Sequence, residues 1–322
     1  MRESDLLSHI YQRSAGLAAA FGQVVVGPGD DCAVIRTPGG DEILLTTDQL
    51  VEGRHYEPGT PIDLIARKAI ARSVSDIAAM GGTPTWSLAT ACLPRGYKHA
   101  DELFDAMHRW AKHWGCPLVG GDIAAFGDEA SPVVLGVTVG GILDPMPIVH
   151  WWEPSEHEDV DEWCRHARRA MKPILRSGAE PGDLVFVTGC LGGAIRSGRH
   201  LTFEPRLKEG QLAAWPDSGV TAMIDLSDGL GRDAGRLARA SGVVLELTGT
   251  RIPVSTDAET WHEAVRDGED YELLVCGSDF FFSNAHDIGH VRALEPGEAP
   301  GVWVTDAYGQ RHEVSQWGWD HE

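Results

Sequence analysis

The sequence lacks the motifs that mark several common classes of enzyme. No lysine follows a glycine, so the phosphate-binding motif GK[ST] is absent, and GLGRDAG at 229–235 misses the dinucleotide spacing GxGxxG by one residue. Neither a GxSxG nucleophile turn nor an HExxH zinc helix occurs. These absences argue against P-loop nucleotide hydrolases, Rossmann dehydrogenases, α/β-hydrolases and zinc metalloproteases.

Basic clusters and long hydrophobic runs are also missing. The chain has 27 Lys and Arg against 48 Asp and Glu, a formal net charge of −21, and no Lys/Arg run that would neutralise a phosphate backbone. We therefore expect no nucleic-acid partner. No run approaches the roughly 18 apolar residues that cross a membrane, and the opening MRESD has no apolar core like that of a signal peptide. We expect a cytoplasmic protein without a membrane partner.

The chain has few cysteines, and their spacing matches no metal-binding or redox motif. The six cysteines form no CxxC motif and lie in apolar stretches, which predicts buried thiols in a reducing compartment rather than disulfides or a zinc site. They are Cys32, Cys92, Cys116, Cys164, Cys190 and Cys276.

Strand and helix signals alternate through two halves of the 322-residue chain. In the first half, strands are expected at 24–27, 42–48, 85–93 and 133–143, with helices at 3–20, 63–80 and 102–114. In the second, strands are expected at 183–189, 221–226, 243–248 and 271–277, with a helix at 231–241. The pattern predicts two α/β domains, at 1–144 and 173–322.

The segment 145–172 separates the halves and is rich in Trp, His and acidic residues. It is interpreted as an inserted linker with a short helix from about 160 to 171. A metal site of His and Glu is the alternative, although the three histidines, His150, His157 and His166, lack regular ligand spacing.

Short carboxylates recur beside Gly, Ser or Thr near the ends of expected strands. They occur in GPGDD at 27–31, TTDQLVEGRH at 46–55, GGD at 120–122 and IDLSDGL at 224–230. Asp76 stands within an apolar helix, where a carboxylate is costly unless it binds a metal or is paired, for instance with Arg72. If these groups converge in a cleft, their common chemistry is holding Mg²⁺ against phosphate oxygens.

Seven ordered motifs together resemble the thiamine-monophosphate kinase family, within the aminoimidazole ribonucleotide synthetase-like superfamily. They are GPGDD, TTDQLVEGRH, ARKAIARSVSDIAAMGGTP, LVGGD, RSGAEPGDLVFVTG, AMIDLSDGL and GEDYELLV. The resemblance runs from about residue 3 to 277, broken by 145–172, and returns at the terminal GWDHE. It implies an N-terminal α/β domain whose sheet builds a homodimer barrel, a C-terminal α/β domain, and ATP with several Mg²⁺ between them.

The resemblance also implies roles for particular residues. The metal-binding set would be Asp31, Thr46, Thr47, Asp48, Asp76, Asp122, Asp225 and Asp228. The ATP contacts would be Gly121, Asp122, Arg176 and Ser227. The substrate contacts would be His55, Glu269 and a residue at Gln316 or Trp317, of which Trp317 is preferred.

Three departures from the family pattern stand out. Ile123 replaces the Thr usual after GGD, the chain ends in Glu322 rather than Phe, and the region 190–210 is short. Other superfamily enzymes fit less well: the synthetase motif DGVGTK is absent, as are the terminal cysteines expected of selenophosphate synthetase and of the hydrogenase-maturation relative. A nucleotide- or metal-binding homologue that has lost catalysis is the alternative from another class.

The implied reaction transfers the γ-phosphoryl group of ATP to thiamine monophosphate. A phosphate monoester has a second pKa near 6, so its oxygen is already anionic at neutral pH and needs no general base. We therefore assign no covalent nucleophile and no catalytic base.

Overall fold

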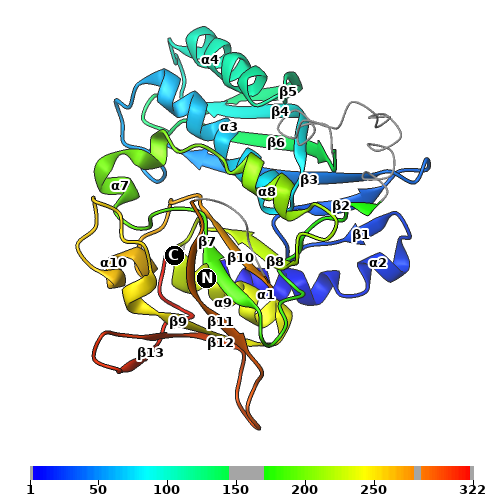
Figure 1. Cartoon of the computed structure of the whole chain (residues 1–322). Helices are drawn as coiled ribbons and strands as arrows, with labels where there is room; N and C mark the ends of the chain where they lie inside the picture. Colours follow the sequence, from blue (N-terminus) through cyan, green and yellow to red (C-terminus); the bar gives the residue numbers. More distant parts are fainter. Residues whose placement is uncertain (1–2, 145–169, 279–283, 320–322) are drawn as a thin grey trace, which may run out of the picture.

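Two β-sheets organise the chain, one in each half of the sequence (Figure 1). The computed structural model describes residues 3–144, 170–278 and 284–319. All strands of the first sheet fall within 24–142 and all strands of the second within 184–313. The expected α/β fold is thereby confirmed. Most of the segment 145–172, expected to be a linker, lies outside the described residues.

The first sheet has six strands in the order β1-β2-β3-β6-β4-β5. Their bounds are β1 Val24–Val26, β2 Ala33–Arg36, β3 Glu42–Val51, β4 Thr83–Leu93, β5 Leu118–Ala125 and β6 Val134–Ile142. Only the β4–β5 pair is parallel. Alternation along β3 buries Leu44, Thr46 and Leu50 on one face and exposes Thr47 and Gln49 on the other.

Within residues 3–144, four helices accompany this sheet: α1 Glu3–Ser14, α2 Leu17–Ala20, α3 Ile62–Ala79 and α4 Ala100–His113. The single helix expected over 3–20 is broken at Gly16, whose φ of 82° lies in the left-handed region. Helix α3 packs on β3 and β6, and α4 packs on α3. Both end before a glycine with positive φ, Gly81 and Gly115, as the sequence predicts.

The second sheet has seven strands in the order β13-β12-β9-β11-β7-β10-β8. Their bounds are β7 Leu184–Val187, β8 Val220–Asp225, β9 Val244–Thr248, β10 Leu273–Gly277, β11 His286–Arg292, β12 Gly301–Thr305 and β13 Arg311–Glu313. The helical elements are α7 Ala194–Ser197, η1 Arg199–Leu201, α8 Leu207–Ala213, α9 Leu230–Ser241, η2 Gly249–Arg251 and α10 Trp261–Arg266. Helix α9 covers one face of this sheet, packing on β8, β9 and β12.

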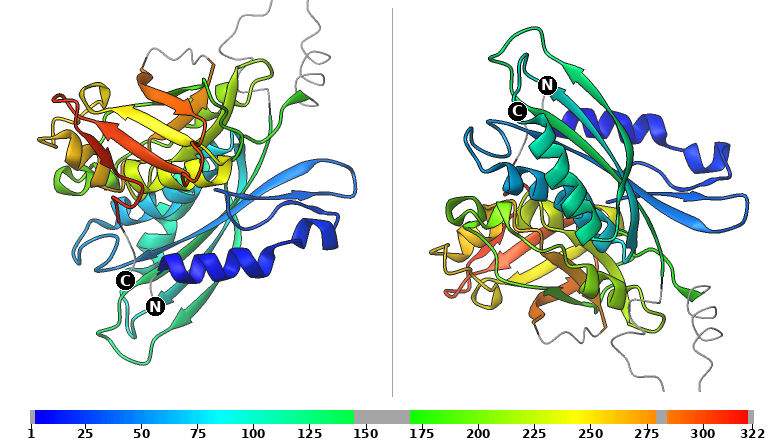
Figure 2. Two further views of the ribbon diagram at one scale, coloured as in Figure 1. Left: turned by 90° about the horizontal axis from the view of Figure 1, so that it is seen from below. Right: turned by 90° about the horizontal axis from the view of Figure 1, so that it is seen from above.

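Helix α3 joins the two halves, because it also contacts β8 and α8. The backbones approach closely here: a Cβ on Gly210 of α8 would lie 2.0 Å from the carbonyl oxygen of Ala78. In Figure 2, α3 lies between the first sheet and the second half of the chain in both views. Side chains of this buried helix therefore reach groups from both halves.

The cysteine expectation holds only in part. Cys32, Cys116 and Cys276 are buried free thiols and Cys92 is half-buried, while Cys164 lies outside the described residues. Cys190 is exposed, so the prediction of burial was wrong there, because it sits in the loop after β7 rather than in the strand. In the described part of the chain, no helix is both long and apolar enough to cross a bilayer.

Candidate functional site

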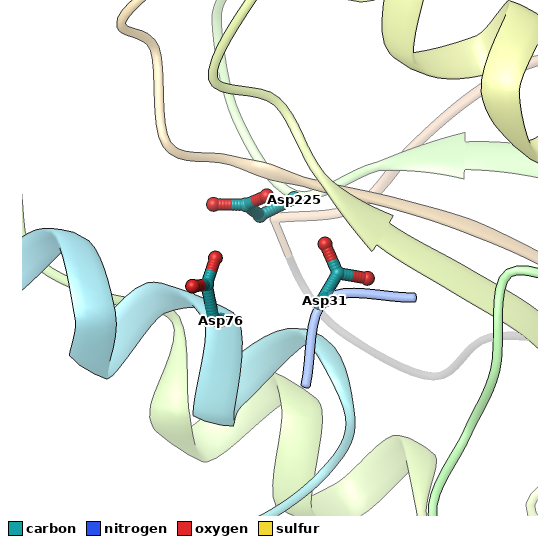
Figure 3. A group of neighbouring side chains, drawn as sticks. All are labelled: Asp31, Asp76 and Asp225. Carbon is teal, nitrogen blue, oxygen red and sulfur yellow. The ribbon is translucent and has the colours of Figure 1, made fainter. Parts of the chain in front are cut away.

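Three carboxylates from distant parts of the sequence meet where the two halves join (Figure 3). Asp31 lies in the loop between β1 and β2, Asp76 on α3, and Asp225 at the end of β8. Each offers an oxygen, and these oxygens all lie within 4.8 Å of one another. In Figure 3 the three side chains point toward a common space. We call these three residues the acidic cluster.

The acidic cluster concentrates negative charge in a buried place. Burial is the largest cause that raises the pKa of Asp76 and of Asp225 well above the usual value; Asp48 and Asp31 respectively are the leading anions that add to it. Carboxylates held this close repel one another unless a cation lies between them. Carboxylate oxygens are also the ligands that Mg²⁺ prefers, so the residues fit such an ion.

Hydrogen bonds fix the orientation of each carboxylate in the acidic cluster. The hydroxyl of Thr46 donates to Asp76, and the hydroxyl of Ser75 donates to Asp225 at 2.7 Å. The guanidinium of Arg176 donates to Asp31 at 2.8 Å. Arg176, expected to contact ATP, therefore lies directly beside a carboxylate of the cluster.

Asp48 lies next to the acidic cluster on the α3-facing side of β3. It accepts a hydrogen bond from the hydroxyl of Ser73 at 3.2 Å and lies 3.5 Å from the guanidinium of Arg72. Arg72 thus pairs with Asp48 rather than with Asp76. Thr47 projects from the opposite face, where its hydroxyl accepts from Thr138 at 3.1 Å, so it lies apart from Asp48.

Gly121 and Asp122 lie at the far edge of the first sheet. Asp122 is in the middle of β5, so the expectation that a strand stops there was wrong. Residues Asp48, Val137, Ala89 and Gly121 are paired in a row across four strands. Three spacings of about 4.8 Å put Gly121 roughly 14 Å from Asp48 along the sheet. Within one chain, the GGD motif is therefore remote from the acidic cluster.

The segment that follows β8 carries Ser227 and Asp228. The carboxylate of Asp228 pairs with Arg236 at 2.6 Å, and its backbone N–H donates to Asp233 at 2.9 Å. The carbonyl of Ser227 accepts the backbone N–H of Glu269 at 2.7 Å. This bond ties the expected ATP contact to the expected substrate contact.

His55 and Glu269 are brought together by Lys68, which sequence reasoning did not assign. The ammonium of Lys68 contacts the carbonyl of His55 at 2.7 Å, the carboxylate of Glu269 at 2.5 Å and Nδ1 of His200 at 2.9 Å. Glu269 has a φ of 67°, which is strained for a residue with a side chain. Such strain at a carboxylate is frequent at functional sites.

Trp317 and Trp319 occupy different surroundings at the C-terminal end. Trp317 is half-buried, stacked 6.0 Å from Trp261 with the guanidinium of Arg266 at 4.2 Å above its ring. Trp319 is 45% exposed, and the guanidinium of Arg54 lies 5.2 Å from the centre of its ring. Its backbone N–H donates to the backbone carbonyl of Asp228 at 2.8 Å. Trp319 therefore spans the two halves, whereas Trp317 packs within the second.

Three residues beside the site have no functional role in the motifs of the sequence. Lys68 and Ser75 are given no role at all, and Arg72 is expected only as an ion-pair partner of Asp76. All three lie on α3, and Lys68, Arg72 and Asp76 repeat at intervals of four residues, which places them on one helix face. That spacing can be read from the sequence. The sequence does not show which face of α3 meets the second half of the chain.

Comparisons with known proteins show which family the chain resembles. Residues 29–143 match the family described as AIR synthase related protein, N-terminal domain. A curated thiamine-monophosphate kinase from Rhodopirellula baltica is 34% identical over 295 residues, covering 85% of this chain and 81% of that protein.

Solved structures are similar over nearly the whole chain. The structure described as AaThiL complexed with AMPPCP and TMP is 25% identical, with a TM-score of 0.75, covering 100% of this chain and 99% of that one. Thiamine monophosphate kinase from Aquifex aeolicus gives a TM-score of 0.71 at 25% identity, covering 97% and 99%. Sequence and fold agree over both halves, and the chain belongs to the thiamine-monophosphate kinase family.

Proposed function

We propose that the chain phosphorylates thiamine monophosphate with ATP, giving thiamine diphosphate and ADP, and that the two phosphate groups meet at the acidic cluster. The observation that carries this proposal is the convergence of Asp31, Asp76 and Asp225 within 4.8 Å at the junction of the two halves. Family membership supports the reaction, and the convergence of the three carboxylates supports its proposed location.

The residues around the acidic cluster suit direct transfer. An acceptor phosphate is already anionic at neutral pH, so no residue is needed to remove a proton. What remains is to bring two anions together in line and to exclude water. Asp31, Asp76 and Asp225, with Thr46 and Asp48 beside them, would hold Mg²⁺; the bound ions would neutralise phosphate charge and orient the oxygens.

The two substrates would approach from opposite sides of the acidic cluster. Arg176 and Ser227 lie on the side of Asp31 and Asp225 and suit ATP. Lys68 contacts His55 and Glu269 at the other end of the α3 face that carries Lys68, Arg72 and Asp76, and this end suits thiamine monophosphate. Trp319 lies beside Arg54 near this end, which makes it a better candidate than Trp317 for stacking on a thiamine ring.

A second copy of the chain is the expected partner. Strand β5 is an open edge of the first sheet, and it exposes Val119 at 65% and Ile123 at 64%. An unpaired edge with exposed apolar side chains needs covering. Because Asp122 on this edge lies far from the acidic cluster of its own chain, we propose a homodimer in which each copy supplies Asp122 to the other copy's site.

Turnover tests the proposed function directly. Purified protein with ATP, Mg²⁺ and thiamine monophosphate should form thiamine diphosphate. Asp76→Asn should lower kcat by at least about 10³-fold while the protein stays folded, since it removes a cluster ligand. The exposed Asp105→Asn on α4 is the matched control and should retain activity. Nucleotide binding without thiamine diphosphate in the wild type would favour a homologue that has lost catalysis.

A further inference from the structure

One buried cation beside the acidic cluster has hydrogen-bonding capacity that the protein does not use. The side chain of Arg72 is 14% exposed, and its guanidinium carries five N–H donors. One Nη1 donor contacts the carbonyl of Gln49 at 2.6 Å, and Nη2 lies 3.5 Å from Asp48, at the limit of a hydrogen bond. The Nε–H is buried and meets no acceptor among the residues that the structure describes.

The unused donors lie on one edge of the guanidinium. Nε and Nη2 form the edge that binds two oxygens of a carboxylate or phosphate at once. Here Nε lacks an acceptor and Nη2 holds a long contact, while the well-made bond belongs to Nη1. A buried donor left unsatisfied is unfavourable, so this edge keeps the hydrogen-bonding capacity to bind an anionic ligand.

The position of Arg72 indicates which anion. It stands four residues after Lys68 and four before Asp76, so the three side chains follow one another about 6 Å apart along α3. Lys68 holds Glu269 and His55 at one end, and Asp76 belongs to the acidic cluster at the other. The anions that face Arg72 are Asp48, Asp76 and Glu269, together with the buried phenol of Tyr271. None of them makes a short contact with the Nε–Nη2 edge.

We propose that Arg72 binds the acceptor phosphate of thiamine monophosphate through its Nε–Nη2 edge. This inference rests on the proposed function, because it assumes that the thiamine end lies toward Glu269 and the ATP end toward the acidic cluster. The phosphate of thiamine monophosphate, placed between these two ends, would lie beside Arg72. The contact would hold the acceptor phosphate near the acidic cluster and favour its dianion. An anionic oxygen of that phosphate attacks the γ-phosphorus of ATP, and ADP leaves as the bond between the γ-phosphorus and the bridging oxygen breaks.

The test measures each substrate separately in the full-length chain. Arg72→Gln should raise KM for thiamine monophosphate about 10- to 100-fold, the effect of a charge-assisted bond, and leave KM for ATP within about twofold. Arg72→Lys keeps the charge beside Asp48 but loses the planar edge, and it should raise the same KM about 5- to 10-fold. Arg109→Gln, which removes an exposed guanidinium on α4, is the control for net charge and should change neither KM.

A role confined to supporting Asp48 would give a different pattern. In that case Arg72→Gln would raise the Mg²⁺ concentration required and KM for ATP, while Arg72→Lys would match the wild type for both substrates. Either result overturns the inference. Binding of thiamine monophosphate by calorimetry, with AMPPCP and Mg²⁺ and no turnover, should show the same ordering of variants. Absence of thiamine diphosphate formation by the wild type would instead count against the proposed function.

Discussion

The ammonium of Lys68 lies 2.5 Å from the carboxylate of Glu269, across the junction between the two halves of the chain. The Lys68 side chain is fully buried, and that of Glu269 is 16% exposed. Burial is the largest cause that lowers the pKa of Lys68, and the charge of Glu269 opposes it. The ammonium also donates to the carbonyl of His55 and contacts Nδ1 of His200. The pair thus fixes the loop that carries Glu269 to helix α3.

Breaking this pair should destabilise the protein strongly. Lys68→Met leaves Glu269 without its cation, and removal of one partner of a buried pair costs about 3–5 kcal/mol. Urea unfolding should show this loss, and Lys68→Met combined with Glu269→Gln should recover part of it. Lys112→Met, an exposed lysine on α4, is the control. Equal stability of Lys68→Met and the control would rule out a structural role for the pair.

Stability should also depend on the protonation of His200. Burial, followed by the charge of Lys68, lowers the pKa of His200 from 6.5 to about 4, while Glu269 acts in the opposite direction. The unfolded chain therefore binds a proton between pH 6.5 and 4 that the folded chain does not. The free energy of unfolding should fall by about 2 kcal/mol as the pH drops through this window, after allowance for partial solvent access.

Replacement of His200 isolates its share of the pH dependence. His200→Gln keeps an acceptor for Lys68 but cannot bind a proton. Its unfolding free energy, measured by urea titration at several pH values, should vary less between pH 4 and 6.5 than that of the wild type. His286→Gln, an exposed histidine on β11, should keep the wild-type dependence. The same slope in His200→Gln and the wild type would show that another group is responsible.

The local sequence pattern predicted the helices and strands that carry the site. It failed for strands whose formation depends on pairing with neighbouring strands. Periodicity located α3 and β3 to within a few residues, and Gly81 marked where α3 ends. Strands β2, β11, β12 and β13 were not predicted, because short or Gly-containing segments carry weak alternation and depend on their neighbours. Asp122 was placed at a strand end because the motif GGD looks like a turn, whereas β4 pairs with it and extends the strand.

The sequence predicted which residues form the acidic cluster, but it did not predict how their side chains are arranged. Aspartates beside Gly and Ser indicated metal chemistry, and three of them do converge. The sequence could not show that Thr47 and Asp48, adjacent in the chain, face opposite sides of β3, or that Arg72 turns to Asp48 instead of Asp76. Those outcomes follow from the register of β3 with β6 and from the contact of α3 with both halves.

The contact between α8 and α3 should tolerate no side chain at Gly210. A Cβ there would lie 2.0 Å from the carbonyl oxygen of Ala78. Gly210→Ala should therefore lower stability by about 2 kcal/mol despite the better helix propensity of alanine, because the two helices must separate. Gly127→Ala, which has open space around it and no positive φ, is the control. A more stable Gly210→Ala variant would mean that α8 adjusts without cost.

The two tryptophans near the C-terminal end should differ in what their loss changes. Trp317→Ala removes packing against Trp261 and Arg266 and should lower stability by about 2 kcal/mol, with little change in KM. Trp319→Ala should change stability by less than about 1 kcal/mol but raise KM for thiamine monophosphate about tenfold, the value of a ring stacking contact. Thermal unfolding and initial rates measure both. The reverse pattern would restore Trp317 as the substrate contact.

Mixed dimers test whether Asp122 serves the site of the other copy. Asp76→Asn removes a carboxylate of the acidic cluster, and Asp122→Asn removes the carboxylate that strand β5 would offer to the partner's site. Each variant alone should therefore be inactive. When the two are unfolded and refolded together, about half of the dimers pair one variant with the other, and each of these contains one site with both aspartates intact. The mixture should therefore regain about a quarter of wild-type activity. If Asp122 instead acted within its own chain, every site in the mixture would lack one aspartate and activity would stay absent.

Val119→Asp on the same edge should give a monomer by light scattering and abolish turnover with the cluster intact, since the partner's Asp122 would then be missing.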